Sequence, residues 1–288
     1  MNDILDILKD SALDTLKLVP FLLVTYLLME YLEHKMSEKT QAAVSRAGRY
    51  GPVIGGILGI IPQCGFSASA ASLYSGRIIS LGTLLAVFLS TSDEMLPIFI
   101  SEKVGAAKII EILLIKAVTA VIIGIAADII VRMLRHEPTG IDIHCICEDD
   151  NCNCEEDGIL KSAVKHTLQI TLFIFIVSLA LDTVMRFLGE DRLSEVFVSV
   201  PVLGCVISSL VGLIPNCAAS VVITELYISG IISAGAMISG LLTGSGIGLL
   251  VLFRTNKHCK KENIKIAFIL LITGTVIGSI MEFMGISV

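Results

Sequence analysis

Two short elements of the sequence combine a proline with an amide, a thiol and a hydroxyl inside an apolar stretch. They read Pro62-Gln63-Cys64-Gly65-Phe66-Ser67 and Pro215-Asn216-Cys217-Ala218-Ala219-Ser220. Because proline lacks a backbone donor, the carbonyls of Leu58 and Val211 are predicted to lose their helical partners. Inside a membrane, such groups are tolerated where they line a polar site. We therefore predict that substrate binds to Pro62, Gln63, Cys64, Ser67, Pro215, Asn216, Cys217 and Ser220.

Acidic residues near these elements are candidates for cation ligands or proton carriers. Ser92, Asp93 and Glu94 end an apolar run, and Glu225 follows the second proline element. Charged residues inside membrane spans are costly and usually functional. The alternative is that these acids mark helix ends at the membrane surface. Glu111 and Lys116 lie in another span, and we expect them to form structural pairs or to reach the interface.

A third group of residues has the composition of a metal site. His144, Cys145, Cys147, Cys152 and Cys154 fall within a segment, 136–158, that contains eight acids and neither Lys nor Arg. Four thiolates and an imidazole can bind Zn²⁺ or another soft ion, so we predict a metal-binding loop. The alternative is a disulfide-paired loop, which needs an oxidising compartment. No further cofactor is required.

The elements that carry these residues are predicted to be membrane-spanning helices. Of the 288 residues, 54% are hydrophobic and 17% are charged, and the mean hydropathy is +0.85. Several nearly charge-free runs approach the ~20 residues that a helix needs to cross a bilayer. This excludes a water-soluble α/β protein. The net charge of −6 arises from the acidic loop, and nothing in the sequence suggests a nucleic-acid partner. Residues 2–17 are amphipathic and are predicted to form an interfacial helix rather than a cleaved signal.

The chain contains an internal repeat at an offset of 153 residues. The offset aligns Pro62 with Pro215, Cys64 with Cys217 and Tyr74 with Tyr227. A single proline element could merely kink a helix, with Cys and Ser as small packing residues, but two in register favour a substrate path. We predict a first membrane repeat at 1–135, a Cys-rich metal-binding loop at 136–160 and a second membrane repeat at 161–288.

The proline element decides the predicted topology. If it crosses the membrane once, each half has four spans and the halves are parallel. If it forms a hairpin or two short spans, the halves are inverted, which is a common transporter plan. Counting Lys and Arg favours inversion weakly and places the central loop in the cytoplasm. The predicted fold is an all-α polytopic membrane protein with two repeats of about five segments each.

The paired Gly-Ile-Ile-Pro-Gln-Cys-Gly-Phe-Ser and Gly-Leu-Ile-Pro-Asn-Cys-Ala-Ala-Ser segments, separated by an acidic Cys-rich loop, resemble the ten-transmembrane heavy-metal exporter family. The resemblance covers nearly the whole chain. That family is related to arsenic-efflux permeases, and some members are labelled manganese transporters. The resemblance implies a multi-pass protein of the cytoplasmic membrane with ten spans.

These observations predict a secondary exporter of a heavy metal, a transition metal or a metalloid such as arsenite. No nucleotide-binding motif is present, so ATP does not drive transport within this chain. An exporter of small anions and a metal sensor that transports nothing are the alternatives. An enzyme is not expected, because no nucleophile is paired with a base. The expected partners are the ion and the lipid bilayer, and the sequence allows a homodimer.

Overall fold

The computed structural model describes residues 48–61, 64–92, 95–134, 159–188 and 201–285, together with scattered helical residues between 9 and 27. These described parts of the chain are helical and contain no strand. The bounds of the first half are α3 (Gly51–Leu58), α4 (Cys64–Ser75), α5 (Leu81–Ser90), α6 (Met95–Ser101) and α7 (Ala106–Met133). The second half has α9 (Ile159–Leu188), α11 (Pro201–Gly212), α12 (Cys217–Ile228), α13 (Ala234–Thr243), α14 (Gly248–Thr255) and α15 (Lys260–Phe283). Two 3₁₀ turns, η1 (Gly48–Tyr50) and η2 (Lys257–Cys259), precede α3 and α15.

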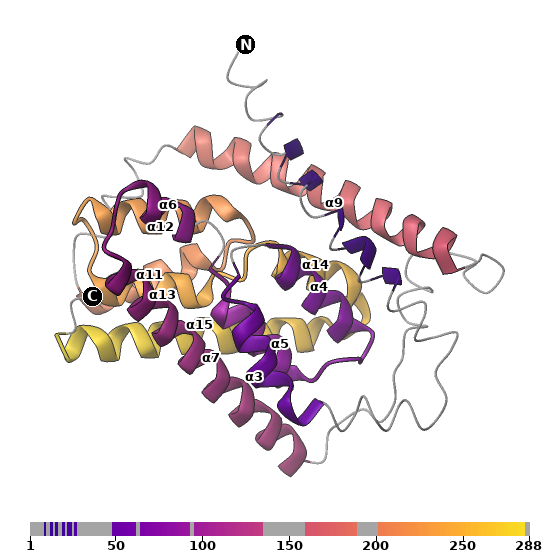
Figure 1. Ribbon diagram of the computed structural model, residues 1–288, viewed down its shortest axis with the longest axis horizontal. Helices are drawn as coiled ribbons and strands as arrows, with labels where there is room; N and C mark the ends of the chain where they lie inside the picture. The colour runs from indigo at the N-terminus through magenta and orange to yellow at the C-terminus, as the bar shows by residue number, and fades with distance from the viewer. Residues whose placement is uncertain are drawn as a thin grey trace.

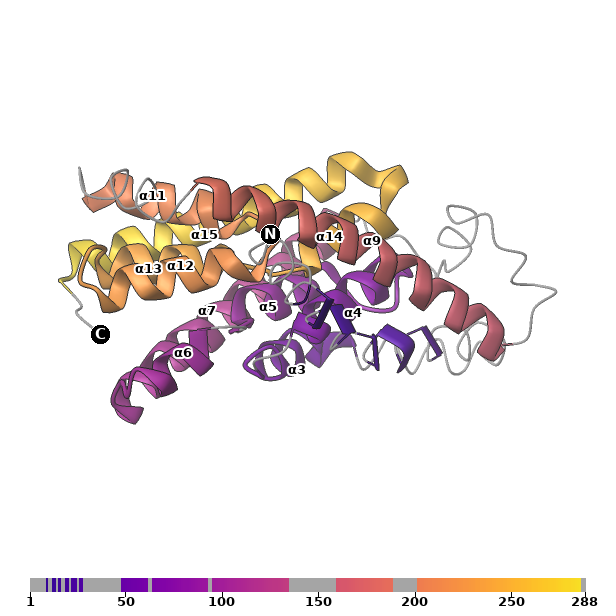
Figure 2. The same ribbon diagram turned by 90° about the horizontal axis from the view of Figure 1, so that it is seen from above.

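The helices of the two halves correspond one to one. In the first half α5 packs on α3 and α7, and in the second half α13 packs on α11 and α15. The two groups overlap in the view of Figure 1, whereas Figure 2 shows α3, α5 and α7 on one side and α11, α13 and α15 on the other. The two halves also contact each other, because α4 packs on α14 and α6 packs on α12. Each half therefore completes the packing of the other.

Both proline elements follow the end of a short helix. The carbonyls predicted to be free are paired, since the Ile61 amide donates to Leu58 O at 3.2 Å and the Ile214 amide donates to Val211 O at 3.0 Å. That part of the sequence prediction is wrong. The helix tightens into a three-residue turn before the proline, and this turn satisfies the last carbonyl. A new helix begins at Cys64 and at Cys217.

Helices α3 and α4, which flank the first proline element, form a hairpin and not a single span. A methyl group added to Gly51 would collide with Thr83 at the start of α5, and one added to Gly59 would collide with Ser90 at its end. Helix α3 therefore runs alongside α5 in the same direction. Helix α4 then returns to the level where α5 begins, because only a short turn joins Ser75 to Leu81. The tip of the hairpin lies at the level where α5 ends.

The contact between α4 and α14 fixes the relative direction of the halves. Ser67 near the start of α4 lies against Gly248 at the start of α14, and the hydroxyls of Ser75 and Thr255 at their ends are 2.6 Å apart. The two helices are therefore parallel. Since α5 starts where α4 and α14 end, the α5–α6 unit and the α13–α14 unit run in opposite directions. This confirms the inverted form of the predicted fold.

Helices α7 and α15 complete each half on its outer side. Within the described part of the chain, four stretches are by length and composition long and apolar enough to cross a membrane: Leu81–Ser101, Ala106–Met133, Ala234–Thr255 and Lys260–Phe283. One face of α7 exposes a stripe of large apolar side chains, including Ile110, Leu114, Val118 and Ile122. Such a stripe suits contact with lipid. The opposite face of α7 carries Lys116, Ala120, Gly124 and Asp128, all of them buried.

The two ends of the helical layer differ in charge. Helices α4, α14 and α7 finish at one end, which we call the basic end. Among the described residues it carries Arg77, Arg132, Arg254, Lys257, Lys260 and Lys261. At the opposite end, α6 finishes and α7 begins, and this connection carries Lys103 and Lys108. The molecule is therefore polarised along the direction in which its helices run.

Candidate functional site

A small cavity lies where the two halves meet. Its first-half wall is made by Thr91, Ser92 and Met95, which follow the end of α5. Its second-half wall consists of Gly212, Asn216, Ser220, Gly240, Leu241, Gly244 and Gly246. The space is about large enough for one water molecule or a bare ion. It brings together three residues that the sequence predicted as substrate-binding, namely Ser92, Asn216 and Ser220.

Helix breaks expose backbone at this cavity. Helix α5 ends at Ser90 and resumes as α6 at Met95, while α13 ends at Thr243 and resumes as α14 at Gly248. Helix α11 ends at Gly212 beside the same space. Gly246 has a φ of 54°, a conformation that glycine adopts without strain. The C-terminal ends of α5, α11 and α13 thus meet at the cavity, and the C-terminal end of a helix carries partial negative charge.

Hydroxyl groups stabilise the break after α5. Thr91 Oγ1 donates to Val87 O at 2.7 Å and Ser90 Oγ donates to Ala86 O at 2.7 Å. Ser92 Oγ donates to Ser90 O at 3.0 Å. These bonds satisfy the hydroxyl protons within the helix end. The oxygen lone pairs remain available as acceptors, which is the property that a cation site needs.

Lys116 on α7 reaches the carbonyls at both helix breaks. Its side chain is 1% exposed. The Nζ atom donates to Thr91 O and, at 2.8 Å, to Leu241 O. The expectation that Lys116 reaches the membrane surface is therefore wrong, and the alternative, that it forms a structural pair, stays a prediction. The long side chain points inward, where its ammonium joins the end of α5 to the end of α13.

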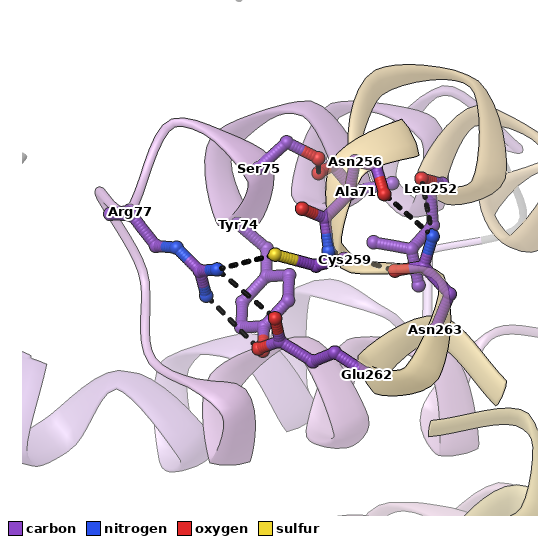
Figure 3. A network of polar contacts seen from close by, with 9 residues as sticks. All are labelled: Ala71, Tyr74, Ser75, Arg77, Leu252, Asn256, Cys259, Glu262 and Asn263. Carbon is purple, nitrogen blue, oxygen red and sulfur yellow. Dashed lines mark hydrogen bonds and ion pairs between the residues drawn. The ribbon is translucent and has the colours of Figure 1, made fainter. Parts of the chain in front are cut away.

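A polar network at the basic end ties the first hairpin to the second half. Figure 3 shows Tyr74, Arg77, Cys259 and Glu262 around one another, with Ser75, Asn256 and Asn263 nearby. Arg77 donates to both carboxylate oxygens of Glu262 at 3.0 Å, and Tyr74 donates to the same carboxylate. The Arg77 guanidinium also lies over the Tyr74 ring, 5.4 Å from its centre. Hydrogen bonding to Glu262 raises the pKa of Arg77, and this outweighs the effect of burial.

Two stretches of the chain match one known family. Residues 3–154 and 133–253 match the family described as "Putative, 10TM heavy-metal exporter", one match over each half. The chain belongs to this family. No match was found among curated proteins or among solved structures. The protein is thus a multi-pass membrane protein, as the resemblance implied.

The helices in the described part of the chain are consistent with ten membrane passes, the number in the family's description. Each half supplies a first helix, two short hairpin helices, a broken span and a long span. The first helix is represented by helical residues between 9 and 27 in one half and by α9 in the other. Counting each hairpin as two short passes gives five segments per half. The family's description and the observed hairpins therefore agree.

The remaining predicted site residues have different positions. Ser67 is fully buried, but it lies against Gly248 and does not line the cavity. Pro215 precedes Asn216 and is partly buried, and Glu225 is exposed near the end of α12. Cys64 and Cys217 begin α4 and α12. Outside the described residues lie Pro62, Gln63, Asp93, Glu94, His144, Cys145, Cys147, Cys152 and Cys154. Within the described part of the chain, no group of three His, Cys, Asp or Glu side chains could hold a metal.

Sequence reasoning gave Lys116 only a structural or interfacial role and did not single out Asp128 of the same helix. The Lys116 ammonium donates hydrogen bonds to carbonyls at the helix breaks, and the Asp128 carboxylate accepts hydrogen bonds at the start of α5. Asp128 is 7% exposed and accepts from Ser80 Oγ and from the Gly82 amide, both at 2.7 Å. A carboxylate at a helix N-terminus is favourable because of the helix dipole. The signal was present in the spacing, since Lys116, Ala120, Gly124 and Asp128 recur every four residues on one face.

Proposed function

We propose that this chain is a secondary transporter that exports a heavy-metal, transition-metal or metalloid ion through the cavity between its halves. Membership of the exporter family supports the cargo class. The observation that carries the proposal is the position of the cavity, at the meeting point of two oppositely directed broken spans. Inverted repeats with broken helices at mid-membrane are the usual place for cargo in secondary transporters.

The polarity of the cavity favours a positively charged cargo over an anion. The ends of α5, α11 and α13 all reach it. Three helix C-termini contribute partial negative charge, and the N-termini of α6 and α12, which begin at Met95 and Cys217, offset part of it. Ser92, Asn216 and Ser220 add neutral oxygen atoms. We propose that these groups bind the cargo, with the thiols of Cys64 and Cys217 at the starts of α4 and α12. Asp93, Glu94 and Glu225 would tune the charge along the path.

The basic end is proposed to face the cytoplasm. Cytoplasmic connections carry an excess of Lys and Arg, and α7 finishes at this end with Arg132. The segment that follows α7 would then leave the membrane on the cytoplasmic side. There its thiols would stay reduced. We propose that His144, Cys145, Cys147, Cys152 and Cys154 capture metal from the cytoplasm before export.

Transport into everted membrane vesicles tests the proposed function. Everted vesicles that contain the wild-type chain are expected to accumulate at least one of Mn²⁺, Zn²⁺ and arsenite above vesicles without it. Asn216→Leu blocks the cavity with an apolar side chain and should lower the initial rate by about 10-fold or more, the effect of losing a desolvated polar contact. Ser229→Ala is the matched control, since Ser229 is an exposed hydroxyl beyond the end of α12. Failure of the wild-type chain to move any of these ions would reject the proposal.

A further inference from the structure

Lys116 occupies the position between the two helix breaks that a cation would be expected to take. Its ammonium contacts Thr91 O in the first half and Leu241 O in the second. Both residues also line the cavity. One side chain therefore joins the carbonyl ends of α5 and α13, which belong to different halves and run in opposite directions.

Lys116 has no basic counterpart in the second half. Asp128 and Gly124 of α7 correspond to Glu282 and Gly278 of α15, an offset of 154 residues. At this offset Lys116 corresponds to Leu270, which is fully buried. A single ammonium thus serves both helix breaks.

A transporter of this kind must close over its cavity twice in each cycle, once with cargo and once without. Closing brings the C-terminal ends of α5 and α13 together, and each end carries about half a negative charge. With cargo bound, the ion offsets this repulsion. Without cargo, some other cation must do so, because buried carbonyls that lose their donors are costly. Lys116 is already in contact with both carbonyls.

We propose that Lys116 is a built-in substitute for the cargo. Its ammonium joins the two halves when the cavity is empty and allows the empty protein to return to its starting orientation. When a cargo cation enters, repulsion between like charges weakens the hold of the ammonium on the two carbonyls. This inference rests on the proposed function, and the test below separates the two.

The test compares net transport with exchange in vesicles that contain the purified full-length chain. Net uptake of labelled metal into empty vesicles requires the empty protein to return at every turnover. Exchange of external labelled metal for internal unlabelled metal does not. Lys116→Met removes the charge while keeping an unbranched side chain. Net uptake should fall by about 10-fold or more, while exchange stays within about 3-fold of wild type, as expected for loss of ~1.4 kcal/mol or more in one step alone. Lys116→Arg should retain both activities.

Several outcomes would overturn the inference. If Lys116→Met keeps net uptake at the wild-type rate, the ammonium is not needed for the return step. If Lys116→Met loses net uptake and exchange together while eluting as a folded protein, Lys116 is only structural. Should that variant not fold, Lys116→Gln, with a shorter uncharged amide, is measured in the same way. Lys108→Met, an exposed position on the same helix, is the control and should match wild type in both assays. If the wild-type chain neither takes up nor exchanges metal, the proposed function itself fails, and this inference with it.

Discussion

The two halves of the molecule share one framework but differ where they meet. In the second half, Gly240 and Leu241 of α13 leave space beside Asn216 and Ser220. The corresponding residues of α5 are Val87 and Phe88. Phe88 lies against Gly248 together with Ser67. The duplicated helices therefore supply a common scaffold, whereas differences in side-chain size between them shape the second-half wall of the cavity.

The ends of the two hairpins differ as well. Arg77 and Gly230 occupy corresponding positions, and both have a left-handed backbone, with φ of 57° and 72°. Arginine adopts this conformation at a cost of about 1 kcal/mol that glycine does not pay. In the first half the cost is offset by the bonds of Arg77 to Glu262. In the second half Tyr227 packs edge-on against Phe99, with ring centres 6.2 Å apart.

Overpacking α13 beside the cavity should have the largest effect. Gly240→Val gives α13 the residue that α5 has at Val87. Its Cβ would lie 2.6 Å from Ile223 and 2.9 Å from the backbone oxygen of Ser208. We expect destabilisation of about 3 kcal/mol, typical of overpacking a buried site, and loss of transport. A lower thermal midpoint in detergent measures this. Gly105→Ala, where the added methyl meets nothing within 4 Å, should leave the midpoint unchanged. An unaltered midpoint for Gly240→Val would contradict the close packing described here.

The acids at the starts of α5 and α13 offer a second comparison. Asp128→Ala removes the acceptor of the Ser80 and Gly82 bonds and should cost about 2–3 kcal/mol, as for hydrogen bonds to a buried charge. Glu282 lies beside Gly235 at the corresponding place but is only partly buried. Glu282→Ala should therefore cost less. Chemical denaturation of both variants in the same detergent checks the order, and equal losses would argue against the asymmetry.

A double-mutant cycle on Arg77 and Glu262 tests the network at the basic end. The side chains are 19% and 32% exposed, so the pair is partly screened by solvent. We expect a coupling energy of about 1 kcal/mol. Arg77→Gly should cost less than Glu262→Ala, because glycine also relieves the left-handed backbone. The coupling should weaken in high salt. Strictly additive effects would show that the pair does not join the first hairpin to α15.

The smallest expected effect is a difference in KM between alanine variants of the two serines in the proline elements. Ser220→Ala removes a hydroxyl from the cavity wall and should raise the KM for the transported metal about 5-fold, the value of one net hydrogen bond. Ser67→Ala, in the packed half, should leave the KM within about 2-fold at equal expression. Initial rates in everted vesicles provide both values. A larger KM effect for Ser67→Ala would mean that the cargo uses the first half instead.

Much of the scaffold could be predicted from the sequence. Long apolar runs, the 153-residue offset and the two prolines were enough to predict two repeated halves with a site at their interface, whereas counting Lys and Arg favoured inverted over parallel halves only weakly. The sequence could not show that Ile61 and Ile214 would satisfy the carbonyls of Leu58 and Val211. Nor could the sequence show the role of Lys116, because its partners are backbone carbonyls, which every residue has. The sequence predicts the same role for Ser67 and Ser220, because the difference between their surroundings lies in the side chains of neighbouring helices.

The central claim is that the halves run in opposite directions and meet at the cavity, and one cross-link tests it directly. In this arrangement α4 and α14 end together, with the Ser75 and Thr255 hydroxyls 2.6 Å apart. Ser75→Cys with Thr255→Cys should therefore form a disulfide. In a chain cleaved between residues 136 and 158, oxidation should join the two fragments in the double variant and in neither single variant. With parallel halves, these residues would lie at opposite faces of a layer about 30 Å thick. Absence of the cross-link in folded, oxidised protein would contradict the account.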